Sequence, residues 1–258
     1  MRADRSFDVG VWLAPQHTTV DRLRDAWRAA DAEGVDSLWL WDHFFPLTGD
    51  PDGTHFEAWT LLAAMAADTR TATIGPLVTN YEFRNPDLLA DMARTVDHLC
   101  GGRLVLGLGA GWVERDCAEY GYRFRPAPER VAGLEDAVRR VRARLDVLNP
   151  PPRGDLPLLI GGDGRRILLR LVAQHADRWN TMAWKFVESS RHLDAWCARV
   201  GREPGTLRRS AFITEPDQLD LLDDLLRAGA DEVVVQLRDP FDMAPVRTLL
   251  ARSRRATA

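Results

Sequence analysis

Short apolar segments alternate with amphipathic segments along the whole chain, and this alternation constrains the fold more than any other feature. Several of the apolar segments are almost continuously hydrophobic, as strands of a parallel sheet covered on both faces must be. Between them, apolar residues recur at the three- and four-residue spacing of helices. The expected strands are residues 8–13, 37–42, 72–78, 104–108, 156–160, 178–182, 208–213 and 232–237.

Eight strand–helix units in about 250 residues predict a closed (β/α)8 TIM barrel, with the whole chain, residues 1–258, as one domain. A doubly wound open sheet is the alternative, but eight regular units without a linker favour closure. The longest expected helix covers residues 129–148 and ends at a proline-rich segment. In barrels of this kind the active site lies at the C-terminal ends of the strands. The residues just after each strand are therefore the candidates for function.

The charge and the cysteine content exclude several classes of protein. With a formal net charge of −4, the chain lacks the basic surface expected of a nucleic-acid-binding protein. Its three cysteines, Cys100, Cys117 and Cys197, are widely spaced and form no CxxC motif, which fits a reducing compartment. The sequence shows no signal peptide and no apolar run long enough to span a membrane. We therefore expect a soluble, cytoplasmic protein that binds neither nucleic acid nor membranes.

The stretch after the fifth expected strand is typical of an anion-binding turn. Gly161, Gly162 and Gly164 follow the strand, and Arg165 and Arg166 are expected in the first turn of the next helix. Glycines let the main chain approach a ligand closely, and a helix N-terminus offers free N–H groups with a partial positive charge. Arginines at that end oppose the helix dipole unless an anion meets them. A tight turn with solvated arginines is the alternative for this turn taken alone.

A histidine and two carboxylates stand where catalytic groups are expected. Asp42 ends the second strand and His43 follows it directly, and Glu114 follows the fourth. A histidine at a barrel mouth is a natural general acid or base, and Glu114 is the reserve candidate for that role. Asp42 and His43 are alternatively a hydrogen-bonded pair within a loop. No spacing among the six histidines assembles a metal site, so no metal is expected.

Other residues at the expected strand ends are aromatic or amide-bearing. Asn80 follows the third strand, Trp112 the fourth and Trp184 the sixth. Such a mouth suits a flat ring system better than a sugar or a metal, although the tryptophans alternatively plug the barrel. Arg84 also follows the third strand, and the alternative for this residue is a surface pair with Asp87 at the start of a helix.

Taken together, these stretches resemble the luciferase-like monooxygenase superfamily, specifically its branch that depends on coenzyme F420. They occur in the family's order along nearly the whole chain, which is more specific than any single motif. The resemblance implies a (β/α)8 barrel that binds a flavin or deazaflavin at the strand C-termini, with the phosphate on the glycine turn. The stretches that carry it are WDHFF, IGPLVTNYEFRNP, GGRLVLGLGAGWVERDCAEYGYRF and LPLLIGGDGRRILLRLVAQHADRWN.

The resemblance also implies roles for individual residues. Asp42 and His43 are expected beside the deazaflavin head group. A non-prolyl cis peptide bond, matching Leu77–Val78 here, is expected to bulge against the ring. The further cofactor-binding residues that the resemblance implies are Asn80, Gly109, Gly111, Gly161, Gly162, Gly164 and Arg165.

Two departures from the family pattern limit this transfer. The family's sugar-phosphate dehydrogenases carry a catalytic glutamate directly after the strand-four glycines, where this chain has Trp112. This argues against a sugar phosphate as substrate. Many members also carry a long insertion before strand five, which here shrinks to residues 150–155. Because that insertion often helps to cover the substrate, we expect a pocket that is more open or is completed by another chain.

The leading interpretation is a coenzyme F420-dependent oxidoreductase that transfers a hydride between the deazaflavin and a small organic substrate. His43 is the expected acid or base, and Asp42 is expected to bond the ring system or to bias the imidazole toward its charged form. An FMN-dependent monooxygenase that uses reduced flavin and O₂ is the alternative, although the WDHFF motif and the short GGDGRR turn favour F420. A barrel that binds a flavin-like ligand without turnover is the third hypothesis. We expect a homodimer.

Overall fold

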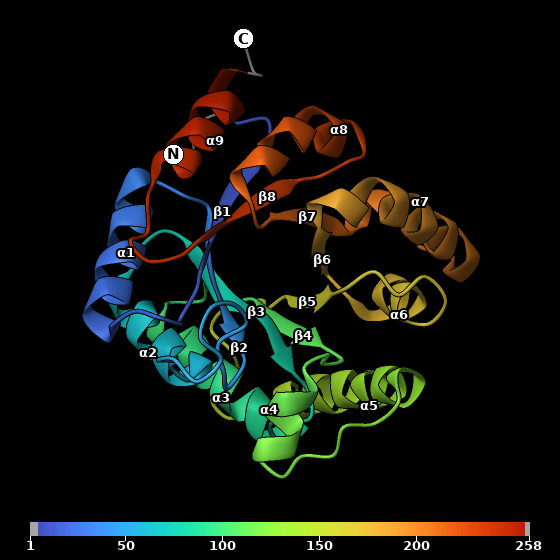
Figure 1. Cartoon of the computed structure of the whole chain (residues 1–258). Coiled ribbons are helices and arrows are strands. Elements are labelled where there is room, and N and C mark those ends of the chain that lie inside the picture. The colour runs from blue at the N-terminus through green and yellow to red at the C-terminus, as the bar shows by residue number, and fades with distance from the viewer. Residues whose placement is uncertain (1–4, 256–258) are drawn as a thin grey trace.

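The computed structural model describes residues 5–255, and Figure 1 views it along the axis of a barrel. Its strands are parallel and pair in sequence order, and β8 closes the barrel on β1. The predicted closed (β/α)8 barrel is therefore confirmed, and the open doubly wound sheet is wrong. The strands are β1 Asp8–Leu13, β2 Ser37–Asp42, β3 Thr73–Asn80, β4 Leu106–Gly109, β5 Leu158–Gly161, β6 Arg178–Met182, β7 Arg208–Ile213 and β8 Glu232–Leu237.

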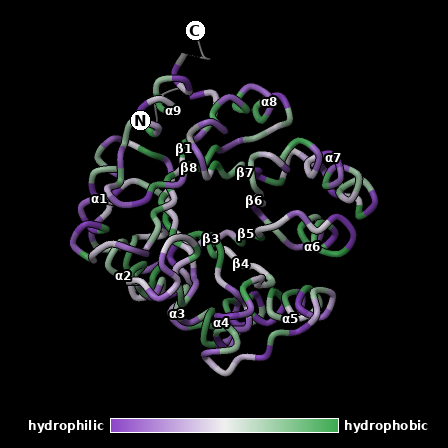
Figure 2. Tube along the Cα trace, viewed as in Figure 1, coloured by the Kyte–Doolittle hydropathy of each residue, from purple (hydrophilic) through white to green (hydrophobic). Residues whose placement is uncertain are grey.

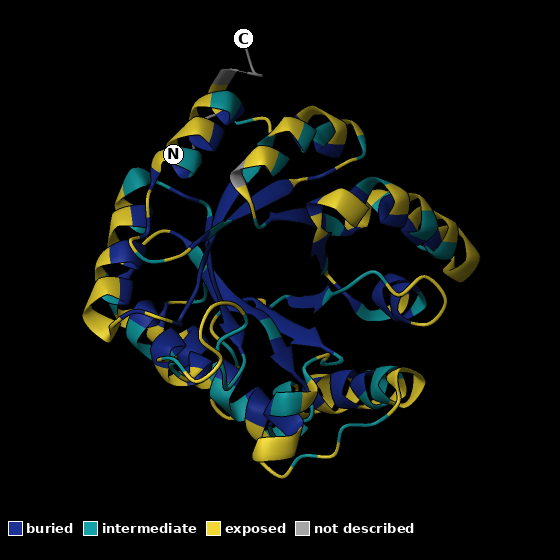
Figure 3. Ribbon diagram, in the orientation of Figure 1, coloured by how far each residue is buried: buried dark blue, intermediate teal, exposed yellow. Residues whose placement is uncertain are grey.

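Helices surround the barrel and bury one face against it (Figure 3). Hydrophobic and hydrophilic residues alternate along these helices, as burial of one face requires (Figure 2). None of the described helices combines the length and apolar character needed to cross a membrane. They are α1 Val20–Glu33, α2 Ala58–Asp68, α3 Pro86–Leu99, α4 Glu114–Glu119, α5 Ala127–Leu145, α6 Leu168–His175, α7 Ala183–Val200, α8 Leu222–Arg227 and α9 Ala244–Arg255, with 3-10 turns at Pro204–Thr206 and Pro216–Leu221.

The interior of the barrel is filled by large side chains. Trp12, Trp39 and Trp41 pack there with Phe212 and Val234, in a cluster separate from the apolar layer between strands and helices. The rings of Trp12 and Trp41 meet edge to face at 4.6 Å, and those of Trp12 and Phe212 at 4.3 Å. The barrel is therefore a packed core, and a ligand can only lie at one of its ends.

Five of the eight strands begin and end where the sequence predicts, and β3, β4 and β5 are shifted by one or two residues at their ends. β5 begins at Leu158 instead of residue 156, because Leu156 has a φ of +46°, which an extended strand does not allow. β3 runs to Asn80, two residues beyond the predicted end. The segment after β4, expected to be irregular, contains the helix α4.

Arg165 and Arg166 lie in a turn before α6 and not in its first helical turn, so that expectation is wrong. The backbone N–H of Leu169 bonds to the carbonyl of Gly164 at 3.0 Å, which makes the turn wider than a helical one. The helix proper begins at Leu168, and no side chain caps its N-terminus.

The shortened segment 150–155 lies at the opposite end of the barrel from the strand C-termini. It leads from α5 into the start of β5, where Asp97 accepts the backbone N–H groups of Arg153 at 2.7 Å and Gly154 at 2.9 Å. Gly154 also packs on Gly102, just before β4. This segment does not border the strand C-termini, and the expectation of a pocket that is more open or is completed by another chain stays a prediction.

Candidate functional site

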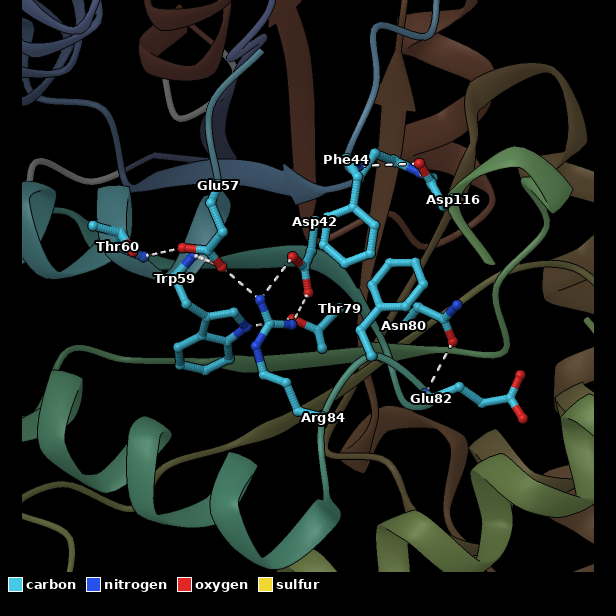
Figure 4. Close-up of polar contacts among 12 residues, drawn as sticks. Asp42, Phe44, Glu57, Trp59, Thr60, Thr79, Asn80, Glu82, Arg84 and Asp116 are labelled. Atoms are coloured by element: carbon cyan, nitrogen blue, oxygen red, sulfur yellow. Dashed lines mark hydrogen bonds and ion pairs between the residues drawn. The ribbon is translucent and has the colours of Figure 1, made fainter. Parts of the chain in front are cut away.

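His43 follows the last residue of β2, and Asp116 of α4 holds its imidazole. Nδ1 of His43 lies 2.5 Å from Oδ2 of Asp116, while the backbone N–H of Phe44 donates to Oδ1 at 3.1 Å (Figure 4 shows this second bond). Asp116 is buried and the His43 side chain is 13% exposed. Within residues 5–255, Nε2 of His43 makes no hydrogen bond. Nδ1 is thus occupied by its bond to Asp116, and Nε2 is available to bond a ligand.

Tryptophans surround this imidazole. The ring of Trp41 lies 6.4 Å from that of His43 and the ring of Trp112 lies 5.8 Å from it, both edge to face. Trp112 is 67% exposed and Trp184, at the start of α7, is 53% exposed. The alternative that these two tryptophans plug the barrel is therefore wrong: they stand exposed beyond the strand ends.

A second histidine lies behind the first. The indole N–H of Trp41 donates to Nε2 of His55 at 2.7 Å, and the two rings stack at 6.2 Å. Burial, assisted by the nearby His43, lowers the pKa of His55 to about 4. His55 is therefore neutral at pH 7, and its Nε2 is a hydrogen-bond acceptor that keeps Trp41 in place.

Asp42 does not bond to His43, contrary to one sequence hypothesis. Its carboxylate receives two bonds from Arg84, at 2.5 Å and 3.2 Å, and Arg84 also binds Glu57 at 2.5 Å (Figure 4). The proposed surface pair of Arg84 and Asp87 is wrong as well, because Asp87 pairs with Arg140. Asp42 instead joins β2 to the segment before α2 through the partly buried guanidinium of Arg84.

Burial and hydrogen bonds shift the pKa values of the two carboxyl groups in this network, Asp42 and Glu57. Burial raises the pKa of Asp42, and Arg84 opposes that rise. Burial also acts on Glu57, but hydrogen bonds from Thr60 and from the backbone of Trp59, together with Arg84, lower its pKa overall. The network is thus an ion triad whose removal in part leaves a buried carboxyl without a partner.

The Leu77–Val78 peptide bond is cis, at the bond that the family resemblance indicates. The side chain of Val78 lies against the ends of the next two strands, where two of the implied cofactor residues stand. A β-carbon on Gly109 would come within 2.5 Å of Val78 Cγ2, and one on Gly161 within 3.0 Å of Cγ1. The glycines of β4 and β5 therefore make room for Val78.

Asn80 lies at the end of β3 beside Gly111. A β-carbon on Gly111 would lie 2.5 Å from Nδ2 of Asn80, and the φ of Gly111 is +72°, so two constraints favour glycine here. Oδ1 of Asn80 accepts the backbone N–H of Glu82 at 3.1 Å (Figure 4). Five implied cofactor residues, from Val78 to Gly161, thus lie together at the ends of β3, β4 and β5.

The turn after β5 carries the remaining implied residues. Gly162 has a φ of +123° and Gly164 packs on Leu168, so both positions favour glycine. Arg165 pairs with Glu188 of α7 at 2.7 Å, and both side chains are more than half exposed. Such an exposed ion pair is weak and is readily exchanged for an anion. Glu114, at the start of α4, is exposed.

A buried donor without a partner lies in the top layer of the barrel interior. The indole N–H of Trp12, next to the last residue of β1, has no hydrogen-bond partner among the described residues. Buried polar groups of this kind are usually satisfied. A flat ligand with ring carbonyl acceptors, such as a flavin or deazaflavin, would satisfy it at the mouth, so the residues present fit such a group.

Asp116 and His55 are functional candidates that the sequence did not reveal. Asp116 is 73 positions from His43, and His55 is 14 positions from Trp41. No single helix or strand spans either separation, so the tertiary fold brings these groups together. The DCAEY context of Asp116 offers no local sign of its partner.

Fold and site together define a class of protein: (β/α)8 barrels that carry an Asp–His pair and a cluster of glycines at the C-terminal ends of the strands. The sequence profile of the luciferase-like monooxygenase family matches residues 6–214, and the chain belongs to this family. The resemblance inferred from the sequence is thereby confirmed at the level of the family.

Named relatives of this chain include F420-dependent enzymes. It is 34% identical over 116 residues to an F420-dependent glucose-6-phosphate dehydrogenase of Amycolatopsis mediterranei, covering 44% of this chain and 34% of the relative. It is 34% identical over 203 residues to a 5,10-methylenetetrahydromethanopterin reductase of Archaeoglobus fulgidus, covering 72% of this chain and 56% of the relative. The chain thus spans between about a third and just over half of the length of these two relatives.

A solved structure shares the fold over almost the whole chain. An F420-dependent secondary alcohol dehydrogenase in complex with an F420–acetone adduct superposes with a TM-score of 0.81, covering 93% of this chain and 96% of that one. The sequence identity of 16% is low, so this likeness bears on the fold alone.

Proposed function

We propose that this chain is a coenzyme F420-dependent oxidoreductase that transfers a hydride between the deazaflavin and a small organic substrate. The observation that carries this proposal is the imidazole of His43, whose Nδ1 bonds to Asp116 and whose Nε2 has no partner among the described residues, at the same end of the barrel as the glycine cluster. The F420-dependent relatives support it. The family's name suggests the FMN-dependent alternative, which the experiment below distinguishes.

The cofactor would be held by main-chain groups more than by side chains. We infer that Gly161, Gly162 and Gly164 receive its phosphate with Arg165, because a wide turn at an uncapped helix N-terminus presents free N–H groups. Val78, Asn80, Gly109 and Gly111 would lie near the ring, where glycines allow close approach. Asp42 would act from behind β2 by holding the backbone that precedes His43.

When bound, F420 supplies a hydride donor or acceptor, and the chain must supply the proton. We assign that role to His43, because hydride transfer to a carbonyl or imine leaves a charge that a proton neutralises. Glu114 is exposed and lies at the start of α4, so it remains the reserve candidate. Trp112 beside His43 presents an apolar surface, which favours a neutral organic substrate over a sugar phosphate.

Titration of the pure protein with F420 and with FMN, followed by quenching of its nine tryptophans, tests the cofactor. Trp12, Trp41 and Trp112 lie at the proposed site, so F420 should quench strongly and FMN weakly. Tight FMN binding without F420 binding would transfer the protein to the monooxygenase alternative. F420 binding without turnover of any carbonyl, imine, activated alkene or alcohol would favour the barrel that binds without catalysis.

His43→Ala tests the proton role. It should keep F420 affinity within a few-fold and lower turnover by about 10²–10⁴, the usual range for general acid–base catalysis. His98→Ala is the matched control, because His98 bonds the carbonyl of Pro151 at the opposite end of the barrel. Unchanged turnover in His43→Ala, with a large loss in Glu114→Gln, would transfer the role to Glu114.

We also propose a cytoplasmic homodimer. Leu88 and Leu99 on α3 are each more than half exposed. Exposed apolar side chains on one helix favour association with another copy. Light scattering of the pure protein measures the mass, and a monomer at all concentrations would contradict the dimer.

A further inference from the structure

We propose that Asp116 is a positioning residue for His43, and that it makes Nε2 the ring atom that gives or takes the proton. The inference rests on the proposed function, since it names how that function's proton is handled. The inference follows from the structure and not from the kinds of residue alone, because α4 places Asp116 next to His43 at the end of β2.

The carboxylate of Asp116 decides which nitrogen of His43 bears hydrogen. An ionised carboxylate only accepts hydrogen bonds, so at 2.5 Å Nδ1 of His43 must be the N–H that donates to Oδ2. The lone pair of the neutral imidazole is then on Nε2. This is the nitrogen without a partner among the described residues.

Asp116 is itself fixed, so the orientation of the imidazole is fixed with it. Its second oxygen accepts the backbone N–H of Phe44, the residue that follows His43. The neighbouring Arg115 ties α4 to the segment after β2: it donates to Asp52 at 2.5 Å and to the carbonyl of Pro51 at 2.7 Å. Its guanidinium also lies 3.9 Å from the ring of Phe45. Four contacts thus hold the two segments together.

The other ionisable groups near His43 do not compete with Asp116. His55, on the segment before α2, is neutral at pH 7 because burial lowers its pKa to about 4. Asp42, the preceding residue in the chain, is directed to Arg84. Glu114, on α4 with Asp116, is exposed. Asp116 is therefore the single described carboxylate that bonds the ring.

With this tautomer, the proton moves between Nε2 of His43 and the oxygen of the substrate. Reduction of a substrate C=O adds a hydride to carbon, supplied by the reduced deazaflavin of the proposed function, and a proton to oxygen. In the imidazolium form, the Nε2–H bond of His43 breaks and its electron pair stays on Nε2, while Nδ1–H remains bonded to Asp116. Oxidation of an alcohol runs the same transfer in reverse, with the oxidised deazaflavin accepting the hydride.

The tautomer can be measured without any activity. In the ¹⁵N spectrum of the neutral imidazole, His43 should show a protonated Nδ1 and a bare Nε2, with its signals assigned by their loss in His43→Gln. In Asp116→Asn, the amide oxygen accepts from Phe44 and the NH₂ faces the ring, so the proton should move to Nε2. A wild-type His43 protonated on Nε2 would overturn the proposal, even if the Asn variant fails to fold.

Turnover is the second readout. Asp116→Asn should lower it by about 10²–10⁴, the scale of a catalytic histidine held in the wrong tautomer, with F420 affinity within a few-fold. Asp116→Glu should recover part of the loss, and Glu203→Gln, at an exposed residue in the turn before β7, should leave turnover unchanged. A changed tautomer with unchanged turnover would overturn the positioning role. Absence of F420 binding in the wild type would instead contradict the proposed function and leave the tautomer result standing.

Discussion

The side chain of Val78 lies over Gly109, so close that a β-carbon at Gly109 would come within 2.5 Å of Val78 Cγ2. We predict that Gly109→Ala costs about 1–3 kcal/mol of unfolding free energy, as overpacking of a core does, and weakens F420 binding by displacing Val78. Urea unfolding and fluorescence titration measure the two effects. Gly205→Ala is the control, because no heavy atom lies within 4 Å of a β-carbon there. Equal effects of the two substitutions would contradict the prediction.

The ion triad of Asp42, Arg84 and Glu57 predicts a large and recoverable loss. Arg84→Met removes the partner of a fully buried carboxylate, which costs about 3–5 kcal/mol. Adding Asp42→Asn to that variant removes the uncompensated charge, so the double variant should be more stable than Arg84→Met alone. Arg227→Met, at an exposed arginine, should change the free energy of unfolding by no more than about 0.5 kcal/mol. A double variant less stable than the single one would show that charge burial is not the cause.

The low pKa of His55 predicts how stability depends on pH. Its pKa falls from 6.5 to about 4 on folding, mainly through burial, so between these values the unfolded chain binds more protons. The contribution is therefore complete above pH 6.5 and is lost as the pH falls to about 4; it amounts to at most roughly 3 kcal/mol. In His55→Gln, the free energy of unfolding should fall less steeply over this window. Parallel curves for the two proteins would contradict this.

Arg165 is held by Glu188 and must exchange that partner for an anion. Arg165→Ala should weaken F420 binding by about 1–3 kcal/mol, the scale of a hydrogen bond to a charged group. Glu188→Gln should leave the binding equal or slightly tighter, because it frees the guanidinium. If a deazaflavin analogue without the phosphate binds the wild type as tightly as F420, the assignment of the phosphate to this turn is wrong.

Most of the barrel could be predicted because strand and helix patterns alternate regularly along the sequence. β1, β2, β6, β7 and β8 match their predicted bounds. β1, β2 and β8 are short, mostly apolar runs, whereas the more polar β6 and β7 follow from their place in the regular alternation of strands and helices. The positive φ of Leu156 could not be predicted, because φ > 0 is rare for a bulky apolar residue and no local pattern signals it. α4 has only six residues, too few for a helical period to show.

The site was predictable by position but not by partner. The sequence placed His43 and the glycines after their strands, and the cis bond at Leu77–Val78, through the family resemblance. It missed that Asp116 and not Asp42 bonds His43, and that Arg84 and not His43 bonds Asp42. These pairs join segments 42 to 73 positions apart, and such contacts follow from closure of the barrel, which no local pattern encodes. The predicted cofactor contacts and the single-domain assignment stay predictions.

The contacts of Arg115 with Asp52, Pro51 and Phe45 make two segments, one after β2 and one after β4, a single module. His43 belongs to the first and Asp116 to the second. Loop exchange between barrels of this family would therefore have to transplant both segments as one cassette. A graft of one segment alone would transfer either His43 or Asp116 without its hydrogen-bond partner.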